Sequence, residues 1–250
     1  IAAANYLGYF VGAVDSMFAR SNHHIRGRLL GGLWLCVLLT LASFWANGFW
    51  SHLLLRFGTG VASAWVLVMI TGLSQPLAIA AGRPRLGALV FAGPGLGILL
   101  TGLLALASNL LGEDSATLWL VYGVVALGML LVILPFLPKP DRGAPQSSAP
   151  AERKGSIAHL GWIYLLYGLG YIIPATFLSQ MASAQFKGAW QADLFWPCFG
   201  LAAAIGVVVA TLRRKDPDTT RRWLMTTLWL QAAGVFACLL GNRWRLALRA

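Results

Sequence analysis

The chain contains few charged residues, and acidic residues are the scarcest of them. Asp and Glu total 8 of 250 residues, charged residues of all kinds make up 11%, and hydrophobic residues make up 58%. With a mean hydropathy of +0.70, this composition excludes an ordinary water-soluble domain and predicts a membrane protein. The chain also lacks a GxSxG, HExxH or P-loop motif and any pair of intramembrane carboxylates. The sequence therefore supports neither an ATP-driven pump nor an intramembrane hydrolase, and we expect no enzymatic activity.

Cysteine and histidine are too few and too scattered to predict a metal or redox site. The three cysteines lie inside apolar runs without CxxC spacing, which is typical of small buried hydrophobes. His23 and His24 adjoin each other in a basic stretch without a second ligand pair, so we interpret them as solvated residues. We expect no metal and no cofactor. The net charge of +11 is divided into short clusters between apolar runs, which favours membrane topology over a nucleic-acid partner.

Eight apolar segments approach the length of about 20 residues that spans a bilayer as a helix. Aromatic residues such as Trp45, Trp50 and Trp119 lie at segment ends, where the lipid headgroups would be. Glu113, Asp114 and Ser115 precede the fifth segment and are predicted to cap its helix. The predicted spans are Asn5 to Phe18, Leu29 to Ala46, Trp50 to Gly72, Leu86 to Leu111, Ala116 to Leu137, His159 to Met181, Leu194 to Leu212 and Trp223 to Gly241.

The one long polar stretch is rich in Pro, Ser and charge and predicts a linker at residues 139–157. It separates residues 1–138 from residues 158–250. Short cytoplasmic loops accumulate Lys and Arg. Alternate loops hold fourteen of these residues, against Lys187 alone in the opposite loops. The fourteen are Arg20, Arg26, Arg28, Arg83, Arg85, Lys139, Arg142, Arg153, Lys154, Arg213, Arg214, Lys215, Arg221 and Arg222. We therefore expect a multi-pass protein whose linker is cytoplasmic.

The two ends of the chain do not fit this plan. The chain opens on Ile1 inside an apolar run, and we expect a missing N-terminus. Arg243, Arg245 and Arg249 follow the eighth span, where the charge rule predicts an external, weakly basic end. Two explanations remain open. Either these arginines belong to a disrupted ninth helix, which we prefer, or the last apolar run turns back without crossing the membrane.

Local motifs resemble the major facilitator superfamily of transporters. In the third span, Arg56 followed by Gly58, Gly60 and small residues resembles the fourth-helix motif of that superfamily, with Thr59 in place of the expected Gln. In the fourth span, Gly93-Pro94-Gly95-Leu96-Gly97 resembles the fifth-helix antiporter motif used for helix packing. The stretch from Gly12 through Arg20 to Arg26 and Arg28 resembles the gating loop, with Ser16 at the acidic position and Asp15 one place earlier.

Two further phrases resemble the YbfB/YjiJ-type permeases within this superfamily. They are Ala4-Asn5-Tyr6-Leu7-Gly8-Tyr9 and the stretch from Tyr167 through Tyr171 and Pro174 to Phe177. The resemblance implies an all-α integral membrane protein with an incomplete major facilitator-type bundle. The eight spans would be helices two to nine of twelve. It also implies a secondary active transporter, a permease that moves a small solute or drug across the bacterial inner membrane by alternating access, with protons as the expected coupling ion, and we expect a monomer.

Arg56 is the sharpest site candidate, because a guanidinium inside a span is costly and usually faces a cavity, a carboxylate or a substrate. The resemblance associates it with proton coupling; it could equally bind an anionic substrate, or extend toward headgroups. Asn5, Tyr9 and Tyr171 are the other substrate or coupling candidates, and Tyr6, Tyr167 and Gln180 are weaker ones. The packing and hinge candidates are Gly93, Pro94, Gly97 and Pro174, and the gating candidates are Arg20, Arg26 and Arg28. The alternatives are a membrane enzyme or assembly scaffold, and then a channel.

Overall fold

The computed structural model describes residues 1–19, 21–137, 161–172, 175–177, 180, 190–213 and 217–247. These residues form helices and turns, and no strand occurs among them. The chain forms two compact units. Unit 1 comprises residues 1–147 and 196–207, and unit 2 comprises residues 148–195 and 208–250. The predicted linker at 139–157 lies outside the described residues. The all-helical architecture of the described chain is the one that the apolar composition predicts.

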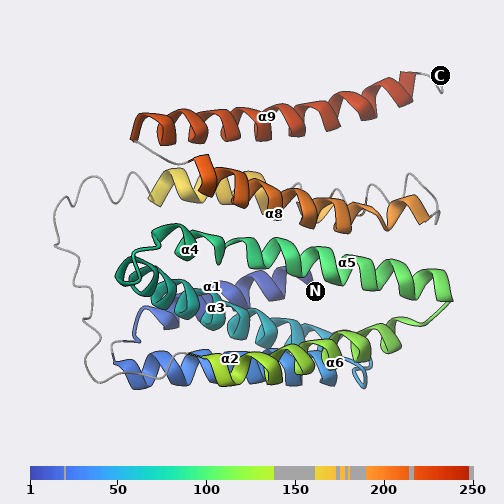
Figure 1. Ribbon diagram of the computed structural model, residues 1–250. Helices are drawn as coiled ribbons and strands as arrows, with labels where there is room; N and C mark the ends of the chain where they lie inside the picture. The colour runs from blue at the N-terminus through green and yellow to red at the C-terminus, as the bar shows by residue number, and fades with distance from the viewer. Residues whose placement is uncertain are drawn as a thin grey trace. The chain divides into compact units, whose positions relative to one another are not determined.

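Unit 1 contains the first helices of the chain, in which α1, α2, α3, α5 and α6 alternate in direction (Figure 1). Their bounds are α1 Ala2–Ser16, α2 Asn22–Ala42, α3 Phe49–Ala80, α4 Pro84–Leu89, α5 Ala92–Leu111, α6 Ser115–Ile133 and the 3₁₀ turn η1 Leu134–Phe136. The 3₁₀ turn η2 Trp190–Ala192 precedes α8 Phe195–Arg213, whose residues 196–207 belong to unit 1. The predicted order of apolar segments is thus the order of the helices.

Several helices differ from their predicted bounds for local reasons. The helix α2 begins seven residues before the predicted Leu29, because the Ser21 hydroxyl accepts a hydrogen bond from the backbone N–H of His24 and caps it. Arg26 and Arg28 are therefore helical residues, not loop residues. The helix α3 continues past Gly72 to Ala80 with Pro76 inside it. In contrast, the predicted capping of the fifth span is confirmed, since the Asp114 side chain accepts from the N–H of Thr117.

The predicted fourth span is two helices, α4 and α5, separated at residues 90–91. Pro94 accounts for the break, because it has no N–H to donate to the carbonyl of Val90. Instead the Gly93 N–H bonds to that carbonyl at 3.1 Å, closing a tighter turn. Pro94 thus lies just inside the start of α5, where a missing N–H costs little.

Small residues bring α1 against α3 without intervening side chains. A Cβ atom on Gly12 would lie 2.6 Å from the carbonyl oxygen of Val61, and one on Gly60 would lie 2.8 Å from the backbone N of Tyr9. A Cβ on Gly8 would overlap the carbonyl oxygen of Phe57. In lipid, where apolar contact with a neighbouring helix replaces apolar contact with lipid, such close backbone approach is a main source of helix association. The seam of Gly8, Gly12 and Gly60 therefore fixes α1 on α3.

The helix α5 packs on the unit 1 part of α8 through a second set of small residues. A Cβ on Gly95 would come within 2.6 Å of the backbone N of Ala204, and one on Gly102 within 2.7 Å of Cδ of Pro197. A Cβ on Gly93 or Gly97 would meet no described atom within 4 Å. The glycines at the close approach are thus Gly95 and Gly102, not the Gly93 and Gly97 of the predicted packing set.

Unit 2 contains a helical segment at residues 161–172, further helical residues at 175–177 and the long helix α9 Pro217–Ala247. Pro174, the predicted kink, lies outside the described residues. The helix α9 runs through Arg243 and Arg245 without interruption. These two arginines therefore continue the helix of the eighth predicted span, and the described chain neither starts a separate ninth helix nor turns back before Ala247. Arg249 lies outside the described residues.

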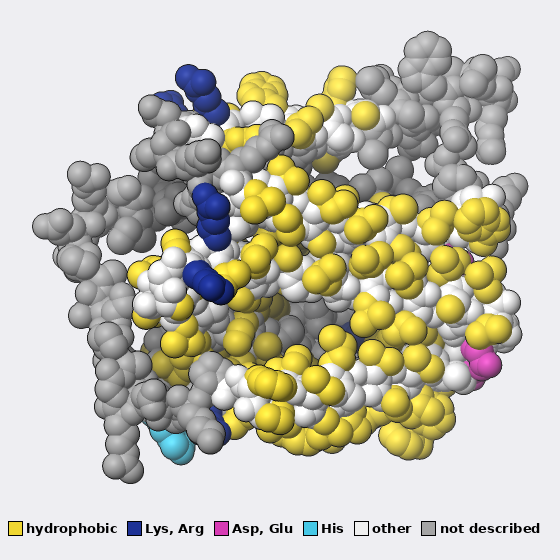
Figure 2. Space-filling view, viewed as in Figure 1, with side chains coloured by type: hydrophobic (Ala, Val, Ile, Leu, Met, Phe, Trp, Pro, Cys, Tyr) yellow, Lys and Arg dark blue, Asp and Glu magenta, His cyan; other side chains and the backbone are white. Residues whose placement is uncertain are grey.

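Five helical stretches of the described chain are long and apolar enough to cross a membrane. They are His23–Ala42, Phe49–Ala80, Pro84–Leu111, Ser115–Phe136 and Trp190–Leu212. The crossings predicted for α1, for the helix around residue 170 and for α9 stay predictions. Large apolar side chains are exposed along the helices, as a lipid solvent requires (Figure 2). In unit 1, Figure 2 shows basic side chains at the end where α2 and α4 begin and acidic side chains at the end where α6 begins. Asp15, paired with Arg28, and Arg56, over Trp119, are exceptions.

Candidate functional site

The guanidinium of Arg56 lies over the face of Trp119. Its Cζ atom is 3.9 Å from the centroid of the indole. Arg56 is seven residues from the start of α3 and Trp119 four residues from the start of α6, so at 1.5 Å per residue they lie roughly 10 Å and 6 Å along their helices. The Arg56 side chain is half-buried. A cation over an indole face gains electrostatic energy from the ring quadrupole without any carboxylate.

Asn5 of α1 supports the backbone beneath Arg56. Its side-chain amide donates to the carbonyl oxygen of Arg56 at 3.0 Å and to the hydroxyl of Thr59 at 3.3 Å. The Thr59 hydroxyl in turn donates to the carbonyl oxygens of Leu55 and Arg56, each at 3.0 Å. The predicted candidates Asn5 and Arg56 are thus in one cluster. Thr59, which occupies the position where the superfamily motif has Gln, belongs to the same cluster.

Trp119 is connected to α5 as well as to α3. Its ring contacts that of Tyr122 edge to face, with centroids 5.6 Å apart. The Tyr122 hydroxyl donates to the carbonyl oxygen of Thr101 on α5 at 2.9 Å. Thr101 lies one residue before Gly102, where α5 meets Pro197 of α8. A continuous path of contacts therefore runs from Arg56 through Trp119 and Tyr122 to the glycine face of α5.

Arg28 and Asp15 form an ion pair at the opposite end of α1 and α2. The Arg28 Nε donates to one carboxylate oxygen of Asp15 at 2.8 Å and the second guanidinium nitrogen donates to the other at 3.1 Å. The two bonds make a bidentate fork, the stronger geometry for this pair. The Arg28 side chain is 20% exposed and the Asp15 side chain 40%. Asp15 thus supplies the acid that the motif comparison places at Ser16, whose hydroxyl donates to the Gly12 carbonyl oxygen instead.

The other gating candidates do not join this pair. Arg26 is exposed on the first turns of α2, and Arg20 lies outside the described residues. The described ion pair is therefore Arg28 with Asp15.

The remaining tyrosine candidates divide between the two units. Tyr9 is half-buried on α1, and its backbone N lies where a Cβ on Gly60 would clash. Tyr171 is 41% exposed and Tyr167 42% exposed in unit 2. Gln180 is an exposed residue.

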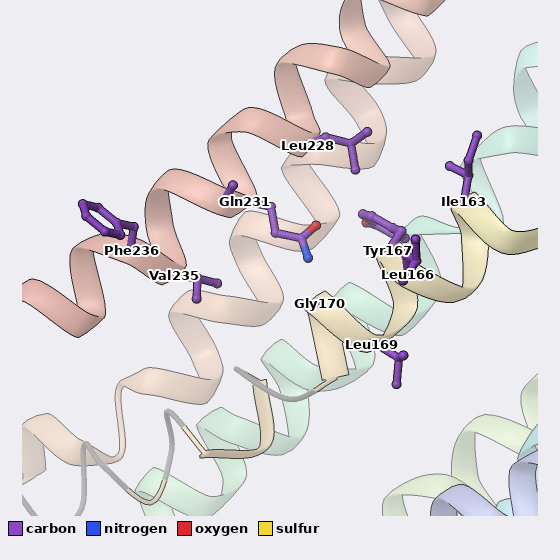
Figure 3. Close-up of a pocket in the computed structure, with 10 residues that line it drawn as sticks. Ile163, Leu166, Tyr167, Leu169, Gly170, Leu228, Gln231, Val235 and Phe236 are labelled. Atoms are coloured by element: carbon purple, nitrogen blue, oxygen red, sulfur yellow. The ribbon is translucent and has the colours of Figure 1, made fainter.

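A groove of about 710 Å³ in unit 2 runs between residues 161–170 and α9 (Figure 3). Its lining is apolar except for Tyr167 and Gln231. Figure 3 shows the Gln231 amide directed from α9 toward the facing helix. A Cβ on Gly170 would come within 2.9 Å of the Gln231 Nε2, so the glycine leaves room for this amide. Of the predicted candidates only Tyr167 lines this groove.

Sequence reasoning missed Trp119 and Tyr122 as partners of Arg56. Trp119 was assigned only to the interfacial aromatic belt, because it lies near the start of a span. The two residues lie at i and i+3 on one helix face, which is the only signal in the sequence that could have connected them. Gln231 was missed for a similar reason, although a polar residue within an apolar run is itself a signal.

The matches to known proteins agree with this architecture. A family model described as the uncharacterised MFS-type transporter YbfB matches residues 1–248. Comparison with curated proteins and with solved structures gives no match. The family match covers nearly the whole chain, including the Arg56 cluster, the Asp15–Arg28 pair and the glycine face of α5. The chain therefore belongs to the YbfB-like transporters of the major facilitator superfamily.

Proposed function

We propose that the protein is a secondary active transporter that moves a small solute or drug across the bacterial inner membrane by alternating access. The observation that carries the proposal is the family match over residues 1–248. Arg56, about two turns inside the long apolar helix α3, supports it, because intramembrane charges are retained where a pathway or a substrate needs them.

The two arginine sites have separate proposed roles. Arg56, Asn5, Tyr9 and Tyr171 contact cargo or influence coupling, and the Asp15–Arg28 pair acts as a gate that must break when the protein changes its open side. The helix α5 packs closely on α8 at Gly95 and Gly102. This contact would have to repack when the protein changes its open side. Pro174 is proposed as a hinge on the basis of its residue type. The linker at 139–157 is proposed to be cytoplasmic, and the protein to work as a monomer.

Protons are the proposed coupling ion. Arg56 cannot carry the proton itself, because a guanidinium stays protonated throughout the physiological pH range. Asp15 is the acidic residue of the described helices that is held by a basic partner, and protonating it would release Arg28.

The experiment is a transport screen with the purified protein in liposomes. Small metabolites and drugs are tested with and without an imposed pH gradient. We expect at least one solute to accumulate in the presence of the gradient, and the accumulation to collapse when a protonophore removes it. Transport that is unaffected by the gradient would contradict proton coupling, and leakage at the rate of empty liposomes for every solute would contradict the transporter proposal.

A further inference from the structure

We propose that the cargo carries an anionic group, a carboxylate or a phosphate, which binds the free donors of Arg56 while Trp119 holds the guanidinium in place. The proposal rests on the proposed transport function and adds a substrate class to it. It also makes Trp119 a positioning residue. The argument depends on which partners Arg56 has, on the shape of its contact with Trp119, and on where the few acidic residues of the chain lie.

Arg56 has no acidic partner among the described residues. Its guanidinium makes one described contact, the one with the Trp119 ring. The ion pair found in the described chain joins Arg28 to Asp15 instead. Arg56 therefore presents its N–H donors without a carboxylate, although guanidinium groups in spans are usually paired.

The positions of the acidic residues explain this. Apart from Asp15, each of the 8 acids lies before a span, after a span or in a connecting segment. They are Asp15, Glu113, Asp114, Asp141, Glu152, Asp193, Asp216 and Asp218. Asp114 is already engaged as the cap of α6. Among the described residues none of these acids is paired with Arg56, so its guanidinium is available to a negative charge from another molecule.

The Trp119 contact is compatible with an anion on the same guanidinium. An indole stacked on the face of a guanidinium leaves the five N–H donors at its edge, in the plane of the group. Carboxylates and phosphates bind in that plane, commonly through two parallel hydrogen bonds. With Cζ of Arg56 over the Trp119 ring, an anion can bind the guanidinium donors that the ring does not cover. Trp119 also excludes water from one face, which strengthens the interaction with the anion.

Trp119 holds Arg56 because it is itself held. It contacts the Tyr122 ring, and the Tyr122 hydroxyl is bound to the Thr101 carbonyl oxygen. From the other side, Asn5 fixes the backbone of Arg56. An arginine with four side-chain rotors loses conformational entropy when it binds a ligand. Because the structure already restricts Arg56 on two sides, less of that cost falls on cargo binding.

An anion could reach Arg56 from the cargo or from a lipid headgroup. The Arg56 end of α3 is the end where α6 begins and α2 finishes, so a lipid phosphate at that membrane face is within reach of a long side chain. The recognition chemistry is the same for both sources. The experiment therefore needs one arm for soluble anions and another for lipids.

The first arm measures equilibrium binding in a detergent without phosphate or carboxylate groups. The probes are shape-matched sets: benzoate with benzamide and benzylamine, acetate with acetamide, and phenyl phosphate. Calorimetry and the shift in thermal unfolding midpoint report binding. We expect at least one anion to bind about tenfold or more tightly than its neutral counterpart. If no anion exceeds its neutral counterpart, the proposal is overturned.

Variants assign that preference to the site. Arg56→Gln should abolish it, and Arg56→Lys should retain it in weakened form, because an ammonium keeps the charge without the fork. Trp119→Leu should weaken anion binding several-fold, and Trp119→Phe less so. The matched controls are Arg85→Gln, at the opposite end of unit 1, and Trp50→Leu, on α3 near Arg56 with its ring 74% exposed. An anion preference that persists in Arg56→Gln, or that Trp50→Leu removes as fully as Trp119→Leu, contradicts the assignment.

The lipid arm repeats the titration with added dioleoyl phosphatidylglycerol. Lipid binding that depends on Arg56 and competes with benzoate or phenyl phosphate identifies headgroups as the ligand of the anion site and overturns its assignment to cargo. Soluble-anion binding that the lipid does not displace supports the site and identifies cargo. Binding needs no gradient, so its outcome is separate from transport. An anion site in a protein that transports nothing would overturn the proposed function alone, and transport without an Arg56-dependent anion preference would overturn this inference alone.

Discussion

Two arginines of unit 1, Arg28 on α2 and Arg56 on α3, lie against opposite ends of α1 and are stabilised in different ways. Arg28 forms a bidentate ion pair with Asp15, whereas Arg56 lies over the face of Trp119. The helix α1 contributes to both, with Asp15 at one end and Asn5 at the other. A guanidinium neutralised by its own chain is suited to a contact that opens and closes. The guanidinium of Arg56, which is supported by the Trp119 ring and by the hydrogen bond from Asn5 to its backbone, is suited to bind an anion from another molecule.

The largest loss of stability should come from replacing Gly60, the glycine that lets α1 pack closely on α3 near Arg56. In Gly60→Ala the new Cβ would overlap the carbonyl oxygen of Asn5 and lie 2.8 Å from the backbone N of Tyr9. Backbone atoms cannot move aside cheaply, so we expect the free energy of unfolding to fall by about 1–3 kcal/mol. Denaturation by SDS titration in mixed micelles measures it.

Gly72→Ala is the matched control on the same helix, because a Cβ at Gly72 meets no described atom within 4 Å. Alanine is also the better helix former. We expect Gly72→Ala to match or slightly exceed the wild-type stability. Equal losses in the two variants would mean that the α1–α3 seam does not depend on close approach at Gly60.

Asn5→Ala should have the next largest effect. It removes the donor to the Arg56 carbonyl oxygen and to the Thr59 hydroxyl, and a lost hydrogen bond of this kind costs about 1 kcal/mol. Thr59→Val removes the bond between Asn5 and Thr59, together with the bonds from the Thr59 hydroxyl to the carbonyl oxygens of Leu55 and Arg56, and leaves the bond from Asn5 to the Arg56 carbonyl oxygen. A double-mutant cycle of the two, followed by thermal unfolding, should show non-additive losses, and strictly additive losses would contradict the shared cluster.

Breaking the Asp15–Arg28 pair should lower the free energy of unfolding by less, although the pair joins two full charges. Both side chains are partly exposed, at 40% and 20%, and such pairs contribute about 0.2–1 kcal/mol. The coupling energy from the cycle of Asp15→Asn and Arg28→Gln measures this. It should shrink as salt is added. A salt-independent coupling energy of several kcal/mol would show that the pair is much better shielded than the structure indicates.

The smallest change in stability should come from removing the Asp114 cap of α6, near the Arg56 site. Hydrogen bonds from the side chain and backbone of Thr117 lower the pKa of Asp114 below its ordinary value of 3.8. The carboxylate therefore stabilises the folded state above pH 3.8, and this contribution is lost as the pH falls through the lowered pKa. Asp114→Asn should reduce the unfolding midpoint at pH 7 and have no effect at pH 2, with Glu113→Gln neutral at both. A larger loss at pH 2 than at pH 7 would reverse the predicted sign.

The sequence predicted the helices better than their ends. Hydropathy and charge located the apolar segments, and Asp114 was identified as a cap from residue type alone. The start of α2 was missed because polar residues such as His23 and Arg26 belong to a helix that begins with a Ser21 cap. Pro94 was expected to pack or hinge within one span, and its missing N–H separates α4 from α5 instead.

The site was predictable only in part. Arg56 and Asn5 stood out by type and motif, because polar groups in a span are costly. Their partners did not, since Trp119 lies 63 residues after Arg56 and an aromatic residue near a span end has an adequate explanation at the interface. Asp15 was one position away from the motif, yet bending of the chain between α1 and α2 places it against Arg28. Pairings between helices depend on packing that residue spacing does not specify.

The most direct test of the account compares binding and transport in one preparation for Arg56→Gln and Asp15→Asn, using the anion that wild type binds best. The account predicts that Arg56→Gln loses both anion binding and transport. It predicts that Asp15→Asn binds the anion as wild type does but transports it at a changed rate, because only the gate is altered. Normal transport by Arg56→Gln, or loss of anion binding in Asp15→Asn, would contradict the separation of the two arginine sites.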